Sequence, residues 1–285
     1  MKNTENYNES KLLKFLYHTV PGRVVLKLFT SPVISKIGGA YMDSGLSRIH
    51  IRGFIKNNGI DMSEYEKTDY QCFNDCFTRK ILPQKRPVCM EENALISPCD
   101  ARLSAYHIDE NSFFFIKHSR YRVSDLIADS RCAPDYQGGV CLVFRLCVDD
   151  YHRYGYVDSG EIVENRKIQG KLHTVRPIAV NQYPVFTQNS REYSIMRTEN
   201  FGTVAQIEVG AMMIGKIKNH QTSGKVLRGT EKGMFLYGGS TIVVLIEKNK
   251  VKLPDVYFEN TKNDMETRVY YGSKIGEKWK QDMGL

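Results

Sequence analysis

The amino-acid sequence predicts an α+β fold, with a β-rich sandwich or barrel as its core and amphipathic helices at its N-terminus. Two observations support this prediction. Residues 8 to about 80 space their apolar side chains as helices do, whereas short β-branched and aromatic runs dominate after PQKRPV (83–88). Gly, Pro, Asn and Asp separate these runs, as they separate the strands of a sheet. We therefore expect an N-terminal helical region over residues 1–60 and a second domain over residues 61–285.

The N-terminal helices are expected in KLLKFLYHTV (11–20) and GRVVLKLFTSPVISKIGG (22–39), which are apolar with lysine and arginine interspersed. Pro21 and Pro32 punctuate them, and we expect each proline to end a helix. Basic amphipathic helices of this kind can lie in the headgroup region of an anionic bilayer. The alternative is a helical subdomain packed on the rest of the chain. Further helices are predicted over 45–58, near 70–80 and over 123–129.

The strand predictions correspond to the β-branched, apolar runs of the second domain. They are FFFI (113–116), VCLVFRLCV (140–148), TVAQIEV (203–209), MMIGKI (212–217) and TIVVLI (241–246).

Composition limits the partners and the compartment. The net charge of +8 and the pI of about 9.0 indicate an anionic partner, such as nucleic acid, phospholipid headgroups or an acidic substrate. No run of 18 apolar residues occurs, so we expect no transmembrane helix. Seven cysteines without a visible secretory signal indicate reduced thiols in the cytosol. Cys72 and Cys76 share a helix face, but no second ligand pair occurs after them, so we expect core packing and no metal site.

Four short segments carry side chains suited to chemistry. They are SPCDARLSAY (97–106) with Asp100, CVDDYHRYGYVDSG (147–160) with His152, GKLHTVRPIAV (170–180) with His173, and GGST (238–241) with Ser240. Each has an ordinary structural interpretation as well. An Asp in a turn is common, a lone His in an apolar run is usually a core residue, and two glycines before a strand often form a hairpin turn. A strand end that crowds His, Arg and acids is nevertheless a plausible wall of a site.

Five motifs, taken together, point to one family. GGST before an apolar strand, DYHRY after FRLCVD, SPCD upstream, IEVGAMMIGKI and METRVYYGSKIGE (265–277) resemble phosphatidylserine decarboxylase. They occur in that family's order, from roughly residue 10 to the C-terminus. The variant with GGST and VDDYHRY resembles the bacterial branch related to the longer eukaryotic enzymes. The resemblance implies a pyruvoyl-dependent carboxy-lyase that decarboxylates phosphatidylserine to phosphatidylethanolamine, as a peripheral protein on the cytoplasmic face of the cell membrane.

The resemblance also implies that the chain makes its own cofactor. The Ser240 hydroxyl would attack the carbonyl of Gly239, and elimination and hydrolysis would leave a pyruvoyl group on a new chain. The products would be a β chain (1–239) and an α chain (240–285) that remain together as a heterodimer, with further dimerisation left open. The pyruvoyl ketone would bind the substrate amine and accept electrons as carbon dioxide leaves. No metal is implied.

Roles for the acid and the histidines come from the same resemblance. Asp100 matches the Asp of the family's Asp–His pair, which prepares the serine. His152 matches the first histidine of the H-R-x-H pattern and would return a proton to the substrate, a role that suits an imidazole titrating near neutral pH. The second histidine is replaced by Gly155. Our hypothesis is that His173, on a following strand, supplies the missing imidazole to Ser240.

Three other functions remain open at this level. The same chemistry could act on another serine-headed lipid, because the headgroup would be identical. A membrane-surface, β-rich binding module would keep the motifs but remain one uncleaved chain. Nucleic-acid binding ranks last, since the sequence shows no recognised motif or basic–aromatic groove pattern.

Overall fold

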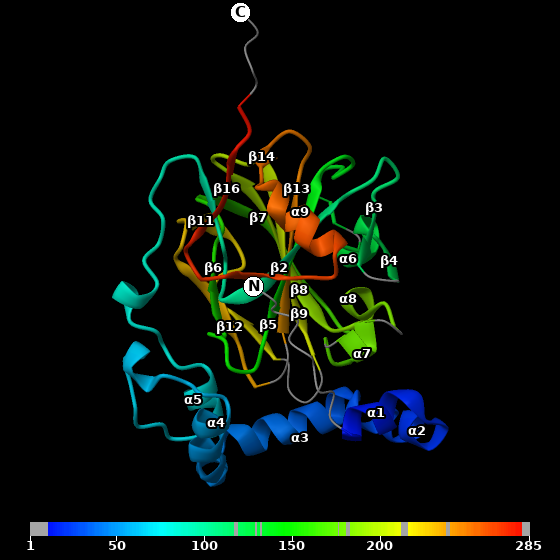
Figure 1. The fold of residues 1–285 in the computed structure, drawn as a ribbon, viewed down its shortest axis with the longest axis vertical. Helices are drawn as coiled ribbons and strands as arrows, with labels where there is room; N and C mark the ends of the chain where they lie inside the picture. Colours follow the sequence, from blue (N-terminus) through cyan, green and yellow to red (C-terminus); the bar gives the residue numbers. More distant parts are fainter. Residues whose placement is uncertain are drawn as a thin grey trace, which may run out of the picture.

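The computed structural model describes residues 11–280, apart from 117–118, 129, 132, 176, 181–182, 212–215 and 238–239. Its centre is an eight-stranded antiparallel sheet in the order β11-β7-β8-β9-β13-β5-β2-β15 (Figure 1). The strands are β2 (Ala101–His107), β5 (Val140–Leu146), β7 (Gly160–Ile168), β8 (Arg191–Thr198), β9 (Thr203–Gly210), β11 (Gly224–Val226), β13 (Ser240–Ile246) and β15 (Thr267–Val269).

Smaller sheets complete the β-rich body. They are β1 (Ala94–Ile96), β16 (Lys274–Lys278) and β14 (Val251–Lys252); β10 (Ile217–Asn219), β12 (Glu231–Phe235) and β6 (Arg153–Gly155); and the hairpin β3 (Phe113–Ile116) with β4 (Ser119–Arg122). Short helices pack around them: α6 (Val123–Leu126), α7 (Pro177–Val180), α8 (Val185–Gln188) and α9 (Asp255–Lys262). The predicted α+β class with a β-rich core is confirmed.

Strand β13 shows why this sheet forms. All seven of its residues are buried, and successive side chains enter opposite faces of the sheet. Val243 and Leu245 join one hydrophobic cluster, together with the N-terminal helices. Ile242, Val244 and Ile246 join a second cluster, beneath β6 and β12. A continuous apolar run is therefore required, because both faces of this central strand are covered.

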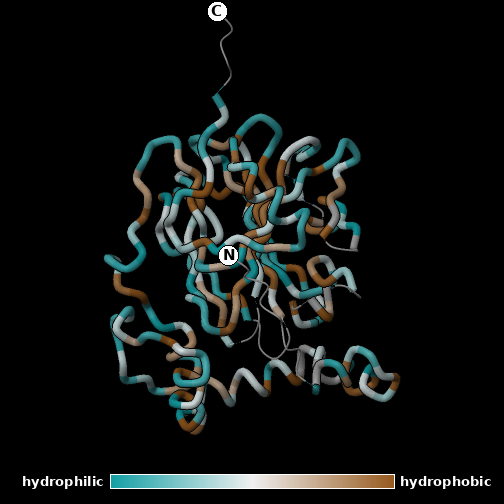
Figure 2. The backbone as a smooth tube through the Cα atoms, in the orientation of Figure 1, coloured by the Kyte–Doolittle hydropathy of each residue, from teal (hydrophilic) through white to brown (hydrophobic). Residues whose placement is uncertain are grey.

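The N-terminal helices form a layer along one end of the body, in blue and cyan in Figure 1. They are α1 (Lys11–His18), α2 (Val20–Phe29), α3 (Pro32–Asp43), α4 (Ile51–Asn57) and α5 (Phe73–Phe77), with 3-10 turns at Gly45–His50, Met62–Glu64 and Pro83–Lys85. Leu16, Tyr17 and Leu26 are buried in the first cluster. Figure 2 shows apolar and polar segments alternating along this layer.

Several local expectations differ from the structure. Pro21 is the second residue of α2 and Pro32 the first of α3, so both prolines lie at helix starts, where a missing N–H costs nothing. The described residues of GKLHTVRPIAV, which exclude residue 176, form no strand: there is one isolated bridge at Lys171, and α7 follows. Most of MMIGKI lies outside the described residues, and only its last residue begins β10.

Two sequence expectations concern membranes and thiols. No helix among the described residues is long and apolar enough to cross a membrane. The cysteines that the structure describes, which exclude Cys132, are all free thiols.

Candidate active site

Ser240 is the first residue of β13, at the end of the central sheet. It lies opposite Leu146 of β5 on one side and Gly210 of β9 on the other. Its side chain is fully buried, and Oγ has no hydrogen-bond partner among the described residues. Such a hydroxyl costs about 1–3 kcal/mol of desolvation, so it points to a functional use. Gly239, the predicted cleavage partner, lies outside the described residues together with Gly238.

His152 lies in the turn between β5 and β6 and is completely buried. Its Nδ1 is 2.9 Å from the carbonyl oxygen of Asp150. Because a carbonyl can only accept, Nδ1 carries the hydrogen, and Nε2 is left with a lone pair. Nε2 has no hydrogen-bond partner in the part of the chain that the structure describes. The ring packs on Phe77, with 4.0 Å between the ring centroids.

The charge state of His152 differs from the sequence expectation. We expected an imidazole that titrates near neutral pH. Burial, assisted by the nearby charge of Arg79, lowers the pKa of His152 to about 3. At neutral pH this imidazole is therefore uncharged, with the lone pair of Nε2 free of a proton.

The backbone brings His152 close to residues 235–240, called here the cleavage segment because they lead to the predicted cleavage site before Ser240. The N–H of Phe235 donates to the carbonyl of His152 at 2.9 Å. Two residues further on, the ring of Tyr237 contacts Phe77, with a centroid separation of 5.3 Å. From Tyr237 to Ser240 the chain can span at most about 11 Å. His152 therefore lies beside the residues that lead into Ser240.

His173 lies near the same end of the sheet, where the side chain of Asn189 holds its backbone. The Asn189 Oδ1 accepts the His173 N–H at 3.0 Å, and the Asn189 Nδ2 donates to the His173 carbonyl at 2.7 Å. Asn189 Nδ2 also lies 2.8 Å from the carbonyl oxygen of Gly210, the residue opposite Ser240. Asn189 therefore links His173 to the strand that pairs with Ser240. Burial, followed by the charge of Lys171, lowers the pKa of His173 to about 4.

Two features of His173 argue against a role as the base for Ser240. The Tyr17 hydroxyl accepts the Thr174 N–H at 3.2 Å, so its own hydrogen is best placed on His173 Nδ1, 3.4 Å away. The remaining imidazole hydrogen then sits on Nε2, which has no described partner. Next to His173, Tyr17 belongs to the first cluster and Tyr183 packs against it. Strand alternation instead directs Ser240 toward the second cluster, which contains Phe235, the residue bonded to the His152 carbonyl.

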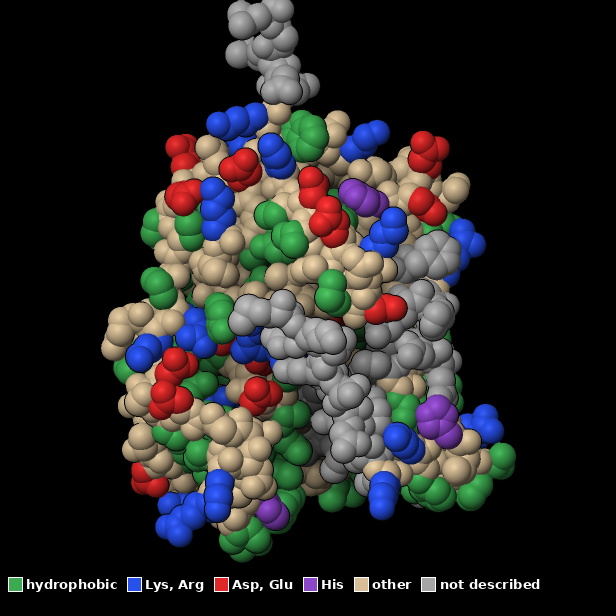
Figure 3. Space-filling view, in the orientation of Figure 1, with side chains coloured by type: hydrophobic (Ala, Val, Ile, Leu, Met, Phe, Trp, Pro, Cys, Tyr) green, Lys and Arg blue, Asp and Glu red, His purple; other side chains and the backbone are tan. Residues whose placement is uncertain are grey.

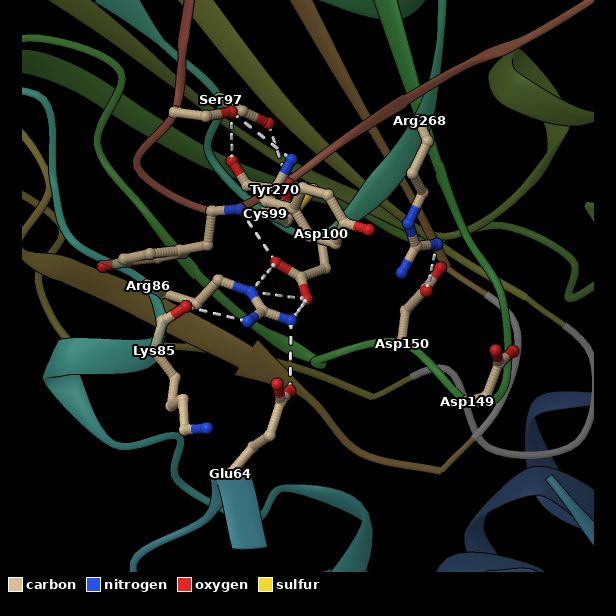
Figure 4. Close-up of polar contacts among 12 residues, drawn as sticks. Glu64, Lys85, Arg86, Ser97, Cys99, Asp100, Asp149, Asp150, Arg268 and Tyr270 are labelled. Carbon is tan, nitrogen blue, oxygen red and sulfur yellow. Dashed lines mark hydrogen bonds and ion pairs between the residues drawn. The ribbon is translucent and has the colours of Figure 1, made fainter. Parts of the chain in front are cut away.

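Asp100 immediately precedes β2 and is buried, but no histidine among the described residues pairs with it. Nε of Arg86 lies 3.0 Å from both carboxylate oxygens, and Nη2 lies 2.8 Å from Oδ2. The N–H of Tyr271 donates to Oδ1 at 2.8 Å. Figure 4 shows Arg86 between Asp100 and Glu64, and the separate pair of Arg268 with Asp150. These residues line a cavity of about 600 Å³.

Comparison with known proteins connects this geometry to a family. A family model described as phosphatidylserine decarboxylase matches residues 73–277, which include Asp100, both histidines and Ser240.

The chain belongs to the phosphatidylserine decarboxylase family.

Relatives named phosphatidylserine decarboxylase proenzyme match the chain along most of its length. "Proenzyme 2" of Clostridium acetobutylicum is 48% identical over 267 residues, covering 93% of this chain and 91% of the relative. The Ruminiclostridium cellulolyticum proenzyme is 42% identical and covers 93% and 91%; that of Clostridium botulinum Alaska E43 is 39% identical and covers 96% and 95%. The chain is accordingly a decarboxylase of this family.

The departure from the family pattern at Gly155 has a structural cause. A Cβ at this position would lie 2.8 Å from the Tyr271 hydroxyl and 2.9 Å from the carbonyl oxygen of Thr230. The Tyr271 hydroxyl is held there by donating to the carbonyl of Gly229 at 2.7 Å. No side chain fits at Gly155 without displacing Tyr271, so the space for the second histidine of the phosphatidylserine decarboxylase pattern is already filled.

Sequence reasoning missed three residues that organise this decarboxylase site. Arg86 appeared only as part of a domain boundary, although an arginine beside a proline turn could have suggested a partner for a buried acid. Tyr271 appeared only as part of the motif METRVYYGSKIGE, with no role of its own, and Asn189 carried no usable signal, because their contacts join segments far apart in the sequence.

Proposed function

We propose that this chain decarboxylates phosphatidylserine to phosphatidylethanolamine with a pyruvoyl group made from its own Ser240. The observation that supports it most directly is the buried, unpartnered hydroxyl of Ser240 among the described residues, which comes after two glycines at the end of the sheet where both imidazoles lie. The names of the relatives supply the substrate and the word proenzyme.

The proposed self-cleavage begins at the Ser240 hydroxyl. Ser240 Oγ loses its proton and attacks the carbonyl carbon of Gly239; the peptide C–N bond breaks as the ester C–O bond forms, and the nitrogen gains a proton. Loss of the Ser240 Cα proton then breaks the Cβ–O bond and releases Gly239 as a carboxylate. The enamine left behind gains a proton on Cβ and loses one from nitrogen to become an imine, and water then replaces the imine nitrogen, which leaves as ammonia. The chains 1–239 and 240–285 would remain associated through β13.

We assign the Ser240 proton to His152, because its Nε2 carries a lone pair and its carbonyl binds Phe235, a member of the cluster that Ser240 faces. The pyruvoyl carbonyl, once formed, would draw electrons from the substrate Cα as carbon dioxide leaves. His152, having accepted a proton, would return one to that carbon.

His173 and Asp100 complete the proposed catalytic set. Asn189 holds His173 beside Gly210, with an Nε2 hydrogen available to donate. Asp100 remains a proposed member through the resemblance; its carboxylate accepts the backbone N–H of Tyr271, whose hydroxyl lies near Gly155.

A membrane surface would explain the N-terminal layer. Eight of the fourteen large apolar side chains that are exposed among the described residues lie between residues 15 and 49. From residue 11 to residue 42 the chain has five lysines and arginines and no acid. Figure 3 shows apolar and basic side chains together along the edge where these helices lie. We propose that this layer binds the anionic, cytoplasmic face of the cell membrane, where the lipid headgroup can reach the site without leaving the bilayer.

Intact-mass spectrometry of the denatured protein tests the proposal. We expect chains 1–239 and 240–285, the smaller one lighter by one ammonia than a serine-ended peptide, and release of carbon dioxide from phosphatidylserine vesicles. The Ser240→Ala variant should remain one 32.7 kDa chain apart from the lost oxygen. A wild-type chain that stays uncut and releases no carbon dioxide would instead support the binding module.

Alanine variants separate the two histidines. His152→Ala should slow self-cleavage by at least about a hundredfold, in the range of a lost general base. His173→Ala should slow it less. The reverse order would return the base to His173, as the sequence hypothesis had it.

A further inference from the structure

Asn74 of α5 connects the N-terminal helices to the segment that precedes Ser240. Its side chain is buried and uses both ends of the amide. Oδ1 accepts the backbone N–H of Tyr237 at 2.9 Å. Nδ2 donates to Oδ1 of Asp43, the last residue of α3, at 2.8 Å. One side chain thus ties two segments that are 163 and 31 residues away in the sequence.

The ring of Tyr237 is held by the same helix. Its centroid lies 4.8 Å from that of Phe73 and 5.3 Å from that of Phe77, both in edge-to-face geometry. Phe77 in turn packs on His152, and the N–H of Phe73 donates to the buried Ser47 hydroxyl at 2.8 Å. Helix α5 therefore contacts the cleavage segment, the imidazole and the N-terminal layer at once.

The two glycines after Tyr237 make this position important. Gly238 and Gly239 are of the residue type with the widest backbone freedom, so they cannot orient the scissile carbonyl by themselves. On one side, Ser240 is fixed between two paired strands. On the other side, the last described backbone contact before the glycines is the bond from Tyr237 to Asn74. An intramolecular attack is fast only when both reacting groups are held in place.

We propose that Asn74 is a positioning residue for self-cleavage, which orients the carbonyl side of the scissile bond through Tyr237 and is itself oriented by Asp43. This inference rests on the proposed cleavage at Gly239–Ser240. It also makes the cleavage rate depend on where the C-terminal end of α3 lies.

A swap of the amide and the acid tests both contacts. In Asn74→Asp the new carboxylate can still accept from Tyr237, but its second oxygen faces the carboxylate of Asp43. We expect self-cleavage to slow by about tenfold or more, the effect of one lost positioning hydrogen bond together with the repulsion. Adding Asp43→Asn restores a donor opposite the carboxylate, so the double variant should recover to within about threefold of the wild type. Asp43→Asn alone leaves an acceptor for Asn74 and is the matched control.

Cleavage is measured as the conversion of newly translated precursor to two chains. Urea unfolding of the same variants in the uncleavable Ser240→Ala chain reports on folding separately. A slow Asn74→Asp precursor, rescued by the swap with an unchanged unfolding midpoint, supports the proposal. Cleavage of Asn74→Asp at the wild-type rate overturns it, as does a slow variant that the swap does not rescue. A wild-type chain that never cleaves would refute the proposed function instead.

Discussion

Arg86 binds the buried carboxylate of Asp100 through two nitrogens, with Nη2 2.8 Å from Oδ2 and Nε 3.0 Å from each oxygen. This side-on pairing leaves Asp100 oriented without a histidine. The arginine is mostly covered as well, with 13% of its side chain exposed.

Removal of the arginine should therefore destabilise the precursor. Arg86→Met in the Ser240→Ala chain should lower the free energy of unfolding by about 3–5 kcal/mol, because it leaves a buried charge unpaired. Arg48→Met is the control: its pair with Asp69 is exposed, and its loss should cost less than about 1 kcal/mol. Urea unfolding measures both, and similar losses would contradict this role for Arg86.

The burial of His152 predicts an acid-sensitive fold. Its pKa falls from 6.5 to about 3 in the folded chain, so the unfolded chain binds more protons. The contribution of the neutral His152 to the free energy of unfolding is therefore fully present above pH 6.5 and is lost as the pH falls toward 3. At about pH 5 this one group should lower the free energy of unfolding by about 2 kcal/mol. In the Ser240→Ala background, His152→Gln should flatten the pH dependence of the unfolding free energy between about pH 7.5 and 5, and an unchanged dependence would contradict this role of His152.

The close contact between Gly155 and Tyr271 predicts that a histidine at position 155 destabilises the chain less when Tyr271 is removed. Gly155→His should destabilise the chain by about 1–3 kcal/mol, because its side chain overlaps Tyr271. Adding Tyr271→Ala opens that space, so the histidine should cost less in this background. Thermal unfolding of the wild type, the two single variants and the double variant measures the coupling energy between positions 155 and 271. If the two losses of stability simply add, Tyr271 is not what prevents a histidine from fitting at position 155.

The N-terminal layer predicts position-dependent membrane binding. Ile49→Asp and Ile37→Asp should each weaken sedimentation with anionic vesicles by at least about tenfold, because each removes an apolar contact and adds repulsion. Met90 and Leu227 are equally exposed, at 76% and 66% against 76% and 65%, but lie outside this layer. Met90→Asp and Leu227→Asp should therefore bind normally. Equal losses at all four positions would reject the layer as the membrane surface.

The sequence predicted those elements whose pattern is local. The run FFFI is a strand with the predicted bounds, and the apolar run from residue 241 is the buried centre of the sheet. The segment around His173 was misjudged because Asn189, sixteen residues away, satisfies its N–H and C=O in place of a neighbouring strand. Pro21 and Pro32 were predicted to end helices but lie at helix starts, because a proline that cannot continue one helix fits the first turn of the next.

From the sequence, site residues could be proposed, but the contacts between them could not be predicted. Ser240 and His152 could be singled out because their neighbours in sequence are unusual. The partner of Asp100, the tautomers of the imidazoles and the contact from Asn74 to Tyr237 depend on side chains that only the folded chain brings together. No local periodicity encodes such contacts.

The placement of Ser240 at the head of β13 has a consequence for precision. The end of a polypeptide is usually its least ordered part, frayed by solvent and free to sample many orientations. Here a break before Ser240 would create an N-terminus whose first residues are already hydrogen-bonded to a strand on each side. The reactive group would then lie on a strand that is paired on both sides within the central sheet, so the substrate would bind at a fixed position and not at a mobile chain end.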